Sequence, residues 1–138
     1  MSSFDRVERD DTPVVFLRAA ADEQAGIEAV WQRLESVVGS LRGRHFLATF
    51  DPATAEYRAC VEVREGDDSD ALGLERDVVP GGTYLRARLR GEPPGLYRRI
   101  RPTFEELVRA AEPDRSRPSL ELYRRHDQVD LLLPIASE

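Results

Sequence analysis

Residues 83–90 read TYLRARLR, and this stretch decides how the second half of the chain folds. Leu85, Ala87 and Leu89 alternate with polar or aromatic positions, the two-residue period of a strand with one buried face. Apolar residues at helical spacing follow, and the proline within them, Pro102, is expected to kink or restart the helix. These helical positions are Leu96, Ile100, Phe104, Leu107, Val108 and Ala111. Residues 119–124 and 129–135 then predict a hairpin that turns at residues 126–128.

The first half of the chain predicts the same order of elements. A short strand at residues 13–19 precedes a helix that we expect to be capped by Asp22 and to end at Gly43, with Arg42 in its last turn. The apolar positions of this helix form one stripe: Ile27, Val30, Trp31, Leu34, Val37, Val38 and Leu41. Two further strands are predicted at residues 45–50 and 57–63.

Two units with the order strand, helix, strand, strand predict an α+β fold. They would form one antiparallel sheet with both helices on one face. We expect a polar N-terminal segment (1–12) and a single domain (13–136), with half-units at about 13–65 and 79–136 and a connector at 66–78. The helix-facing side of the sheet is predicted to carry Tyr57, Val61, Leu85, Leu89, Leu120, Leu122, Leu131 and Leu133. The other side is predicted to carry Arg58, Glu62, Tyr84, Arg86, Arg88, Glu121, Tyr123 and Asp130.

Composition excludes several classes of protein. The 138 residues carry a net charge of −6, and all 20 basic residues are arginine, so extensive phosphate contacts with nucleic acid are not expected. One cysteine (Cys60) and two histidines (His45 and His126) predict neither a metal site nor a bound cofactor. The chain has no apolar run of about 20 residues and no secretory signal, so we expect a cytoplasmic protein without a membrane partner.

Other local patterns favour ordinary structural roles. The acidic run at residues 67–70 fails as a calcium loop, because Val79 stands where the last acidic ligand belongs. Cys60 has no neighbouring base, and no Gly-x-Ser-x-Gly motif is present, so a nucleophilic hydrolase is not indicated. The arginine-rich stretch at residues 86–101 is interpreted as a solvated surface.

A set of short strings, in order, resembles the GyrI-like small-molecule-binding family, which also supplies effector-binding domains of MerR-type and AraC-type regulators. The strings are LGLE (72–75), VPGGTY (79–84), RG (90–91), LELY (120–123) and LPI (133–135), and WQRL (31–34) fits the first helix. The resemblance covers about residues 13–136. It implies two half-units related by a pseudo-twofold axis, with a ligand groove near their junction.

The resemblance also implies which residues meet a ligand. The glutamate that contacts lipophilic cations in drug-binding members corresponds to Glu121, and Tyr123 lies on the same side of that strand. Asp130 corresponds to an acid of the last strand, while Leu132 stands where an aromatic residue often follows. The expected ligand-binding residues are therefore Glu121, Tyr123, Tyr84, Trp31, Asp130 and Arg86. If an arginine such as Arg86 pairs with Glu121, the groove would prefer a neutral or anionic ligand.

Three functions stay open. The first is a stand-alone module that binds small lipophilic molecules. Only residues 1–12 precede the first predicted strand, so no DNA-binding domain and no direct DNA contact is expected. The second is a hydrolase of strained, reactive natural products, in which Glu121 activates water and Tyr123 or Tyr84 orients it. The third is a protein-interaction module similar to the gyrase inhibitor that gives the family its name.

Overall fold

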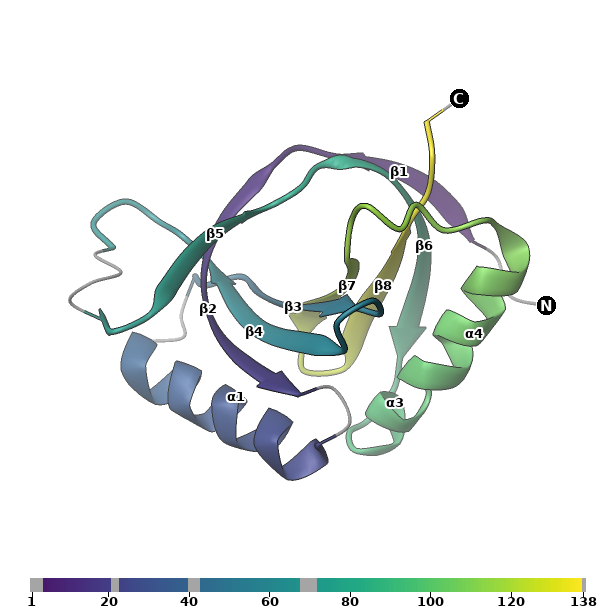
Figure 1. Cartoon of the computed structure of the whole chain (residues 1–138). Coiled ribbons are helices and arrows are strands. Elements are labelled where there is room, and N and C mark those ends of the chain that lie inside the picture. Colours follow the sequence, from purple (N-terminus) through teal and green to yellow (C-terminus); the bar gives the residue numbers. More distant parts are fainter. Residues whose placement is uncertain (1–3, 21–22, 40–42, 68–71, 138) are drawn as a thin grey trace.

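A computed structural model describes residues 4–20, 23–39, 43–67 and 72–137 of the chain (Figure 1). The strands of the first half are β1 (Asp5–Arg9), β2 (Thr12–Ala20), β3 (Phe46–Asp51) and β4 (Glu56–Glu62), and those of the second are β5 (Glu75–Val79), β6 (Gly82–Arg90), β7 (Ser119–Arg125) and β8 (Gln128–Pro134). The helices are α1 (Gln24–Val38), α3 (Gly95–Arg98) and α4 (Ile100–Ala110).

All eight strands form one antiparallel sheet in the order β1-β6-β8-β7-β3-β4-β2-β5. The sheet is strongly curled, with α1 outside one half and α3 and α4 outside the other (Figure 1). Helix α1 packs on β2 and β4, and α4 packs on β6 and β8. The α+β fold expected from the alternating patterns is confirmed. We call the side of the sheet that meets the helices the helix face, and the side enclosed by the curl the inner face.

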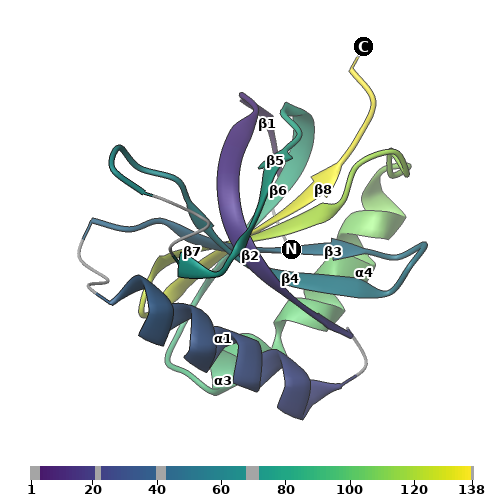
Figure 2. The same ribbon diagram turned by 60° about the vertical axis from the view of Figure 1, so that its left-hand side comes forward.

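Strands β1 and β5 were not predicted, and they tie the two halves together. Strand β1 pairs with β6, and β5 pairs with β2. Both pairings keep the same register, because Arg9 lies opposite Gly82 and Thr12 lies opposite Val79. The chain bends between these two pairs. The pairs β1–β2 and β5–β6 therefore act as two long bent strands that run side by side over the curled sheet (Figures 1 and 2). Both β1 and β5 consist mainly of charged residues, so their sequences lack the apolar alternation that predicts a strand.

The bend requires a glycine at position 81. A Cβ atom there would collide with the Arg9 carbonyl oxygen and would lie 2.7 Å from the backbone of Asp10 and Asp11. The Gly81 N–H also donates a 2.7 Å hydrogen bond to Asp11 Oδ1. The two backbones thus approach each other more closely than any side chain allows.

Helix α1 ends earlier than its apolar stripe predicts. Gly39 takes a left-handed φ of 78°, and its N–H donates to the Glu35 carbonyl oxygen, which closes the helix after Val38. The predicted end at Gly43 is therefore wrong. The proposed cap Asp22 and the last-turn residues Leu41 and Arg42 lie outside the described residues.

The expected break before α4 is confirmed. The helical stripe divides at Arg99, and Pro102 is the third residue of α4. The first four N–H groups of a helix have no partner within it, so a proline costs no hydrogen bond there.

The predicted faces of β7 are reversed. Glu121 lies opposite Ala48 of β3 and Leu131 of β8, and both of these neighbours pack toward the helices. Glu121 and Tyr123 therefore lie on the helix face, whereas Leu120 and Leu122 belong to the inner-face core. The error arose because β7 buries apolar side chains on the inner face as well, so alternation alone does not show which side meets the helices.

The other predicted faces hold. Leu85, Leu89, Leu131 and Leu133 pack under α3 and α4, and Tyr57 and Val61 pack under α1. Tyr84 belongs to the inner-face core, while the register places Arg86 beside Leu132 and Arg88 beside Asp130 on that same face.

Candidate functional site

Glu121 lies beside Tyr123 in a group of four aromatic side chains where the two halves of the helix face meet. We call this group the aromatic cluster: Trp31 of α1, Tyr57 of β4, Tyr97 of α3 and Tyr123 of β7. Strands β3 and β7, which join the halves, place Phe46 opposite Tyr123 and Ala48 opposite Glu121. The small side chain of Ala48 leaves room for the carboxylate beside it.

Hydrogen bonds link Glu121 to the first half of the chain. The Tyr123 hydroxyl donates to Glu121 Oε1 at 2.5 Å, and the hydroxyls of Tyr123 and Tyr57 are hydrogen-bond partners. Trp31 Nε1 donates to the Tyr57 hydroxyl at 2.8 Å. One polar chain therefore runs from α1 through β4 to β7 within an otherwise apolar layer.

The aromatic rings meet edge to face. The Trp31 and Tyr123 ring centres lie 5.3 Å apart at 76°, and those of Tyr97 and Tyr123 lie 6.4 Å apart at 72°. Such geometry is favourable for neighbouring rings. Tyr97 is 47% exposed, whereas Tyr57 is 6% exposed, so Tyr97 forms the outer rim and Tyr57 the floor.

The electrostatic environment of Glu121 is unusual for a carboxylate. Burial raises its pKa above the ordinary value, and the hydrogen bond from Tyr123 opposes part of that increase. Burial together with the nearby Glu121 charge raises the pKa of Tyr123. Within the described residues no arginine or histidine contributes to the pKa of Glu121. The site holds a carboxylate that lacks a cation from this part of the protein.

The arginines that were expected to compete for Glu121 have other partners. Arg58 pairs with Glu56 and Asp77, at 2.6 and 2.7 Å. Arg86 pairs with Asp5 at 2.7 Å. Both arginines extend from the inner face, so the sheet itself separates them from Glu121.

The structure brings together three of the six expected ligand-binding residues: Trp31, Glu121 and Tyr123. Tyr84 is completely buried on the inner face, where its hydroxyl donates to the Pro80 carbonyl oxygen at 2.6 Å. Arg86 and Asp130 also lie on the inner face, away from the aromatic cluster.

Sequence reasoning assigned Tyr57 to the core and did not single out Tyr97. A usable signal was present for Tyr57, because its predicted position on the helix face is correct and points it toward α1. Tyr97 follows Leu96 in the one-turn helix α3, and its contact with Tyr123 depends on where the chain leaves β6. No spacing rule supplies that position.

Two possible chemistries find no support in the described part of the chain. No group of three His, Cys, Asp or Glu side chains there is arranged to hold a metal ion. Cys60 is fully buried, which raises the pKa of its thiol to about 12 and makes a thiolate nucleophile unfavourable.

Among the described helices, none has the length and apolar character needed to cross a bilayer.

Comparison with known proteins gives matches among solved structures alone. No protein-family model and no curated protein matches the chain. A structure of SAV2435 bound to tetraphenylphosphonium superimposes with a TM-score of 0.69 at 16% identity, over 98% of this chain and 94% of that one. The EcmrR C-terminal domain gives 0.71 at 11% identity, over 100% and 99%. A protein described as a hydrolase from Listeria innocua gives 0.58 at 8% identity, over 98% and 92%.

The structural superpositions establish the fold, but the sequence identities are too low to assign a ligand. The matches span nearly the whole chain, and they include a protein solved with tetraphenylphosphonium and the C-terminal domain of EcmrR. The chain shares its fold with these solved structures.

Proposed function

We propose that this protein binds small lipophilic molecules, cations among them, at Glu121 between α1 and α3. The observation that carries the proposal is a partly buried carboxylate without a cationic partner among the described residues, bonded to a tyrosine of the aromatic cluster. An organic cation would supply the missing charge, and the rings would contact its apolar surface.

The energetics favour such a ligand. A charge pair is stronger in a partly dry site than in water, because the surroundings screen it less. Each aromatic face adds cation–π attraction of roughly 0.5–2 kcal/mol. A partly buried carboxylate without a counter-ion is costly, so a lipophilic cation relieves a penalty that is already present in the free protein.

Two structural neighbours support this type of ligand and role. SAV2435 was solved with tetraphenylphosphonium, a lipophilic cation, and the EcmrR neighbours include a complex with DNA. By analogy, we propose that this chain is a small-molecule-binding domain of the effector type.

We propose that a ligand approaches Glu121 beside Tyr97. The Tyr97 ring contacts the Tyr123 ring edge to face and is 47% exposed, so it forms the accessible side of the aromatic cluster. A ligand that contacts Tyr97 and Tyr123 would leave the hydrogen bond between Trp31 and Tyr57 intact.

Titration with tetraphenylphosphonium tests the proposal, with the fluorescence of Trp31, the single tryptophan, as the signal. Triphenylphosphine oxide serves as a neutral aromatic comparison. We expect Glu121→Gln to weaken binding of the cation by about tenfold or more, equivalent to about 1.4 kcal/mol, and to change binding of the neutral compound much less.

Glu105→Gln is the matched control, because Glu105 is exposed on α4. Its affinity for the cation should equal that of the unmodified protein. Equal cation affinity of Glu121→Gln and Glu105→Gln would contradict the proposal.

One observation favours hydrolysis as a second candidate. Glu121 has a raised pKa and a hydrogen-bonded tyrosine beside it, which suits a general base that activates water. Incubation with a cyclopropane-containing electrophile, followed by mass spectrometry, tests this candidate. Hydrolysis would add one water to the compound in the presence of the unmodified protein, and Glu121→Gln would abolish the reaction. The protein-interaction alternative stays a prediction.

A further inference from the structure

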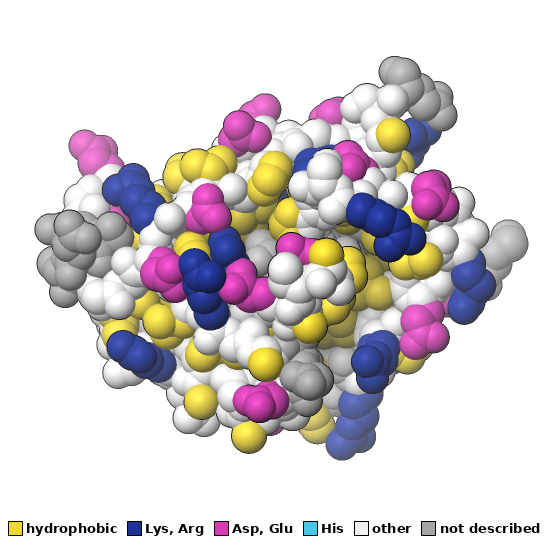
Figure 3. Space-filling view, viewed as in Figure 1, with side chains coloured by type: hydrophobic (Ala, Val, Ile, Leu, Met, Phe, Trp, Pro, Cys, Tyr) yellow, Lys and Arg dark blue, Asp and Glu magenta, His cyan; other side chains and the backbone are white. Residues whose placement is uncertain are grey.

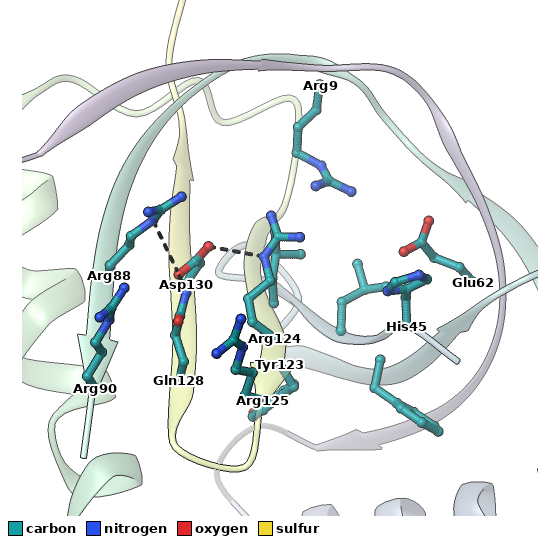
Figure 4. A pocket seen from close by; sticks show the side chains of 13 residues that line it. Arg9, His45, Glu62, Arg88, Arg90, Tyr123, Arg124, Arg125, Gln128 and Asp130 are labelled. Carbon is teal, nitrogen blue, oxygen red and sulfur yellow. Dashed lines mark hydrogen bonds and ion pairs between the residues drawn. The ribbon is translucent and has the colours of Figure 1, made fainter. Parts of the chain in front are cut away.

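The inner face contains a pocket of about 500 Å³ that is separate from Glu121. Its basic side chains come from three strands: Arg9 from β1, Arg88 and Arg90 from β6, and Arg124 and Arg125 from β7. Figure 4 shows them around the space enclosed by the curl, with Gln128 and Asp130 between β6 and β7. The volume is that of an ordinary small-molecule site.

The charge of this pocket opposes the charge of the protein. Five arginines and two carboxylates, Glu62 and Asp130, line it, although the whole chain carries a net charge of −6. Elsewhere on the surface, basic and acidic side chains are interspersed (Figure 3). Arg18 and Glu75, for example, form a 2.7 Å pair across β2 and β5. A local excess of positive charge in a concave site attracts anions.

Asp130 holds part of the pocket in a fixed arrangement. Its carboxylate is completely buried and accepts hydrogen bonds from Arg124 Nε at 3.1 Å and Gln128 Nε2 at 3.2 Å. Arg88 Nε lies 3.9 Å from its other side. The Arg124 contact uses Nε, and within the described residues the terminal nitrogens of that guanidinium make no hydrogen bond. Asp130 thus orients a planar donor toward the pocket before any ligand arrives.

Arg90 and Arg125 complete the arrangement. Both are exposed, and neither forms an ion pair with another described residue. Figure 4 places them on opposite sides of Gln128, and the three side chains border one space. Leu47 and Leu122 are buried beside them on the inner face. The pocket therefore offers several guanidinium donors above an apolar floor.

We propose that this pocket is a second binding site, for a small organic molecule that carries at least two negative oxyanion charges. Phosphate and clustered carboxylate groups share the required chemistry, because both accept the paired N–H donors of guanidinium. A long nucleic acid fits less well, since the arginines line a concave space inside the curled sheet and the whole chain carries a net charge of −6. This site does not depend on the function proposed for Glu121.

Isothermal titration of the full chain at constant ionic strength tests the proposal. The probes are pyrophosphate and citrate, which separate phosphate from carboxylate recognition. The pocket variant is Arg90→Gln/Arg125→Gln, which removes two exposed charges without touching the Asp130 contacts. The control is Arg33→Gln/Arg109→Gln, which removes two exposed charges from α1 and α4.

We expect saturable binding of at least one probe, weakened about tenfold or more in the pocket variant and less than about twofold in the control. Equal weakening in both variants would show non-specific attraction and overturn the proposal. Failure of both probes to saturate would also overturn it, as would tighter binding of a single-stranded oligonucleotide that pyrophosphate does not displace. Glu121→Gln should leave binding of the probe unchanged, which separates this test from that of the cation site.

Discussion

The Tyr123 hydroxyl donates a hydrogen bond to Glu121 two positions earlier on the same side of β7. The two side chains form a single polar unit within the helix-facing layer. Burial raises the pKa of both groups, and each influences the other. The carboxylate is therefore held in place by a neighbour that cannot neutralise its charge.

This arrangement predicts how Glu121→Gln changes stability with pH. The folded-state pKa of Glu121 lies above its unfolded value, so protonation favours the folded state. Stability from this group is fully present below the unfolded pKa of about 4.3 and is lost as pH rises through the folded pKa. The glutamine variant does not titrate, so its stability relative to the unmodified protein should increase across that window.

Urea unfolding between about pH 4 and pH 8 measures this difference. Glu105→Gln, exposed on α4, is the comparison and should show a nearly constant difference. A Glu121→Gln difference that does not grow with pH would argue against an unfavourable buried carboxylate.

The hydrogen bond between Trp31 and Tyr57 predicts a coupled pair. Tyr57→Phe should destabilise the protein by about 1–3 kcal/mol, because it leaves a partly buried indole N–H without its acceptor. In the double variant Trp31→Phe/Tyr57→Phe the donor is gone as well. The double variant should therefore lose less stability than the sum of the losses in the two single variants. Urea unfolding followed by circular dichroism checks this cycle, and strict additivity would exclude the coupling.

The close backbone approach at Gly81 predicts a site intolerant of any side chain. Gly81→Ala should cost about 1–3 kcal/mol or more, because the new Cβ must push the Arg9–Asp11 backbone away. A Cβ at Gly95 would meet no atom within 4 Å, so Gly95→Ala is the control and should cost little. Thermal unfolding compares the two variants, and similar midpoints would show that the bend adjusts freely.

Cys60 predicts a thiol that reports unfolding. It is fully buried, burial raises its pKa to about 12, and its Sγ lies 3.7 Å from the Arg58 carbonyl oxygen as a hydrogen-bond donor. At pH 8 a disulfide reagent should label the native protein slowly, and urea should accelerate labelling by about 100-fold or more. Cys60→Ala gives the background, and rapid labelling of the native protein would contradict the structure.

Periodicity predicted the elements that bury one face against a helix. The α1 stripe and the alternation of β4 and β6 are strong because their polar and apolar sides have different neighbours. Strand β7 was assigned the wrong way round because Leu120 and Leu122 are apolar toward the inner face, while Glu121 faces an apolar layer. Alternation assumes that polar side chains face solvent. Because Glu121 instead lies on the helix face, the pattern assigned both sides of β7 wrongly.

Periodicity does not predict the charged strands β1 and β5 or the position of Tyr97, for a different reason. Strand β5 is exposed at Glu75–Val78 and buried only at Val79, so its pairing with β2 leaves almost no trace in hydropathy. The contact between Tyr97 and Tyr123 joins two elements far apart in the chain. Both features depend on long-range pairing, which local composition does not encode.

The exchange of β1 and β5 between the two halves has a consequence for folding. Strand β1 belongs to the first half yet pairs with β6, and β5 belongs to the second half yet pairs with β2. Each half therefore completes its sheet with a strand that the other half supplies, and neither edge forms until distant segments have met. Such high contact order is associated with slow folding. The chain is expected to unfold in one cooperative step, with a single midpoint for the tryptophan signal and the backbone signal.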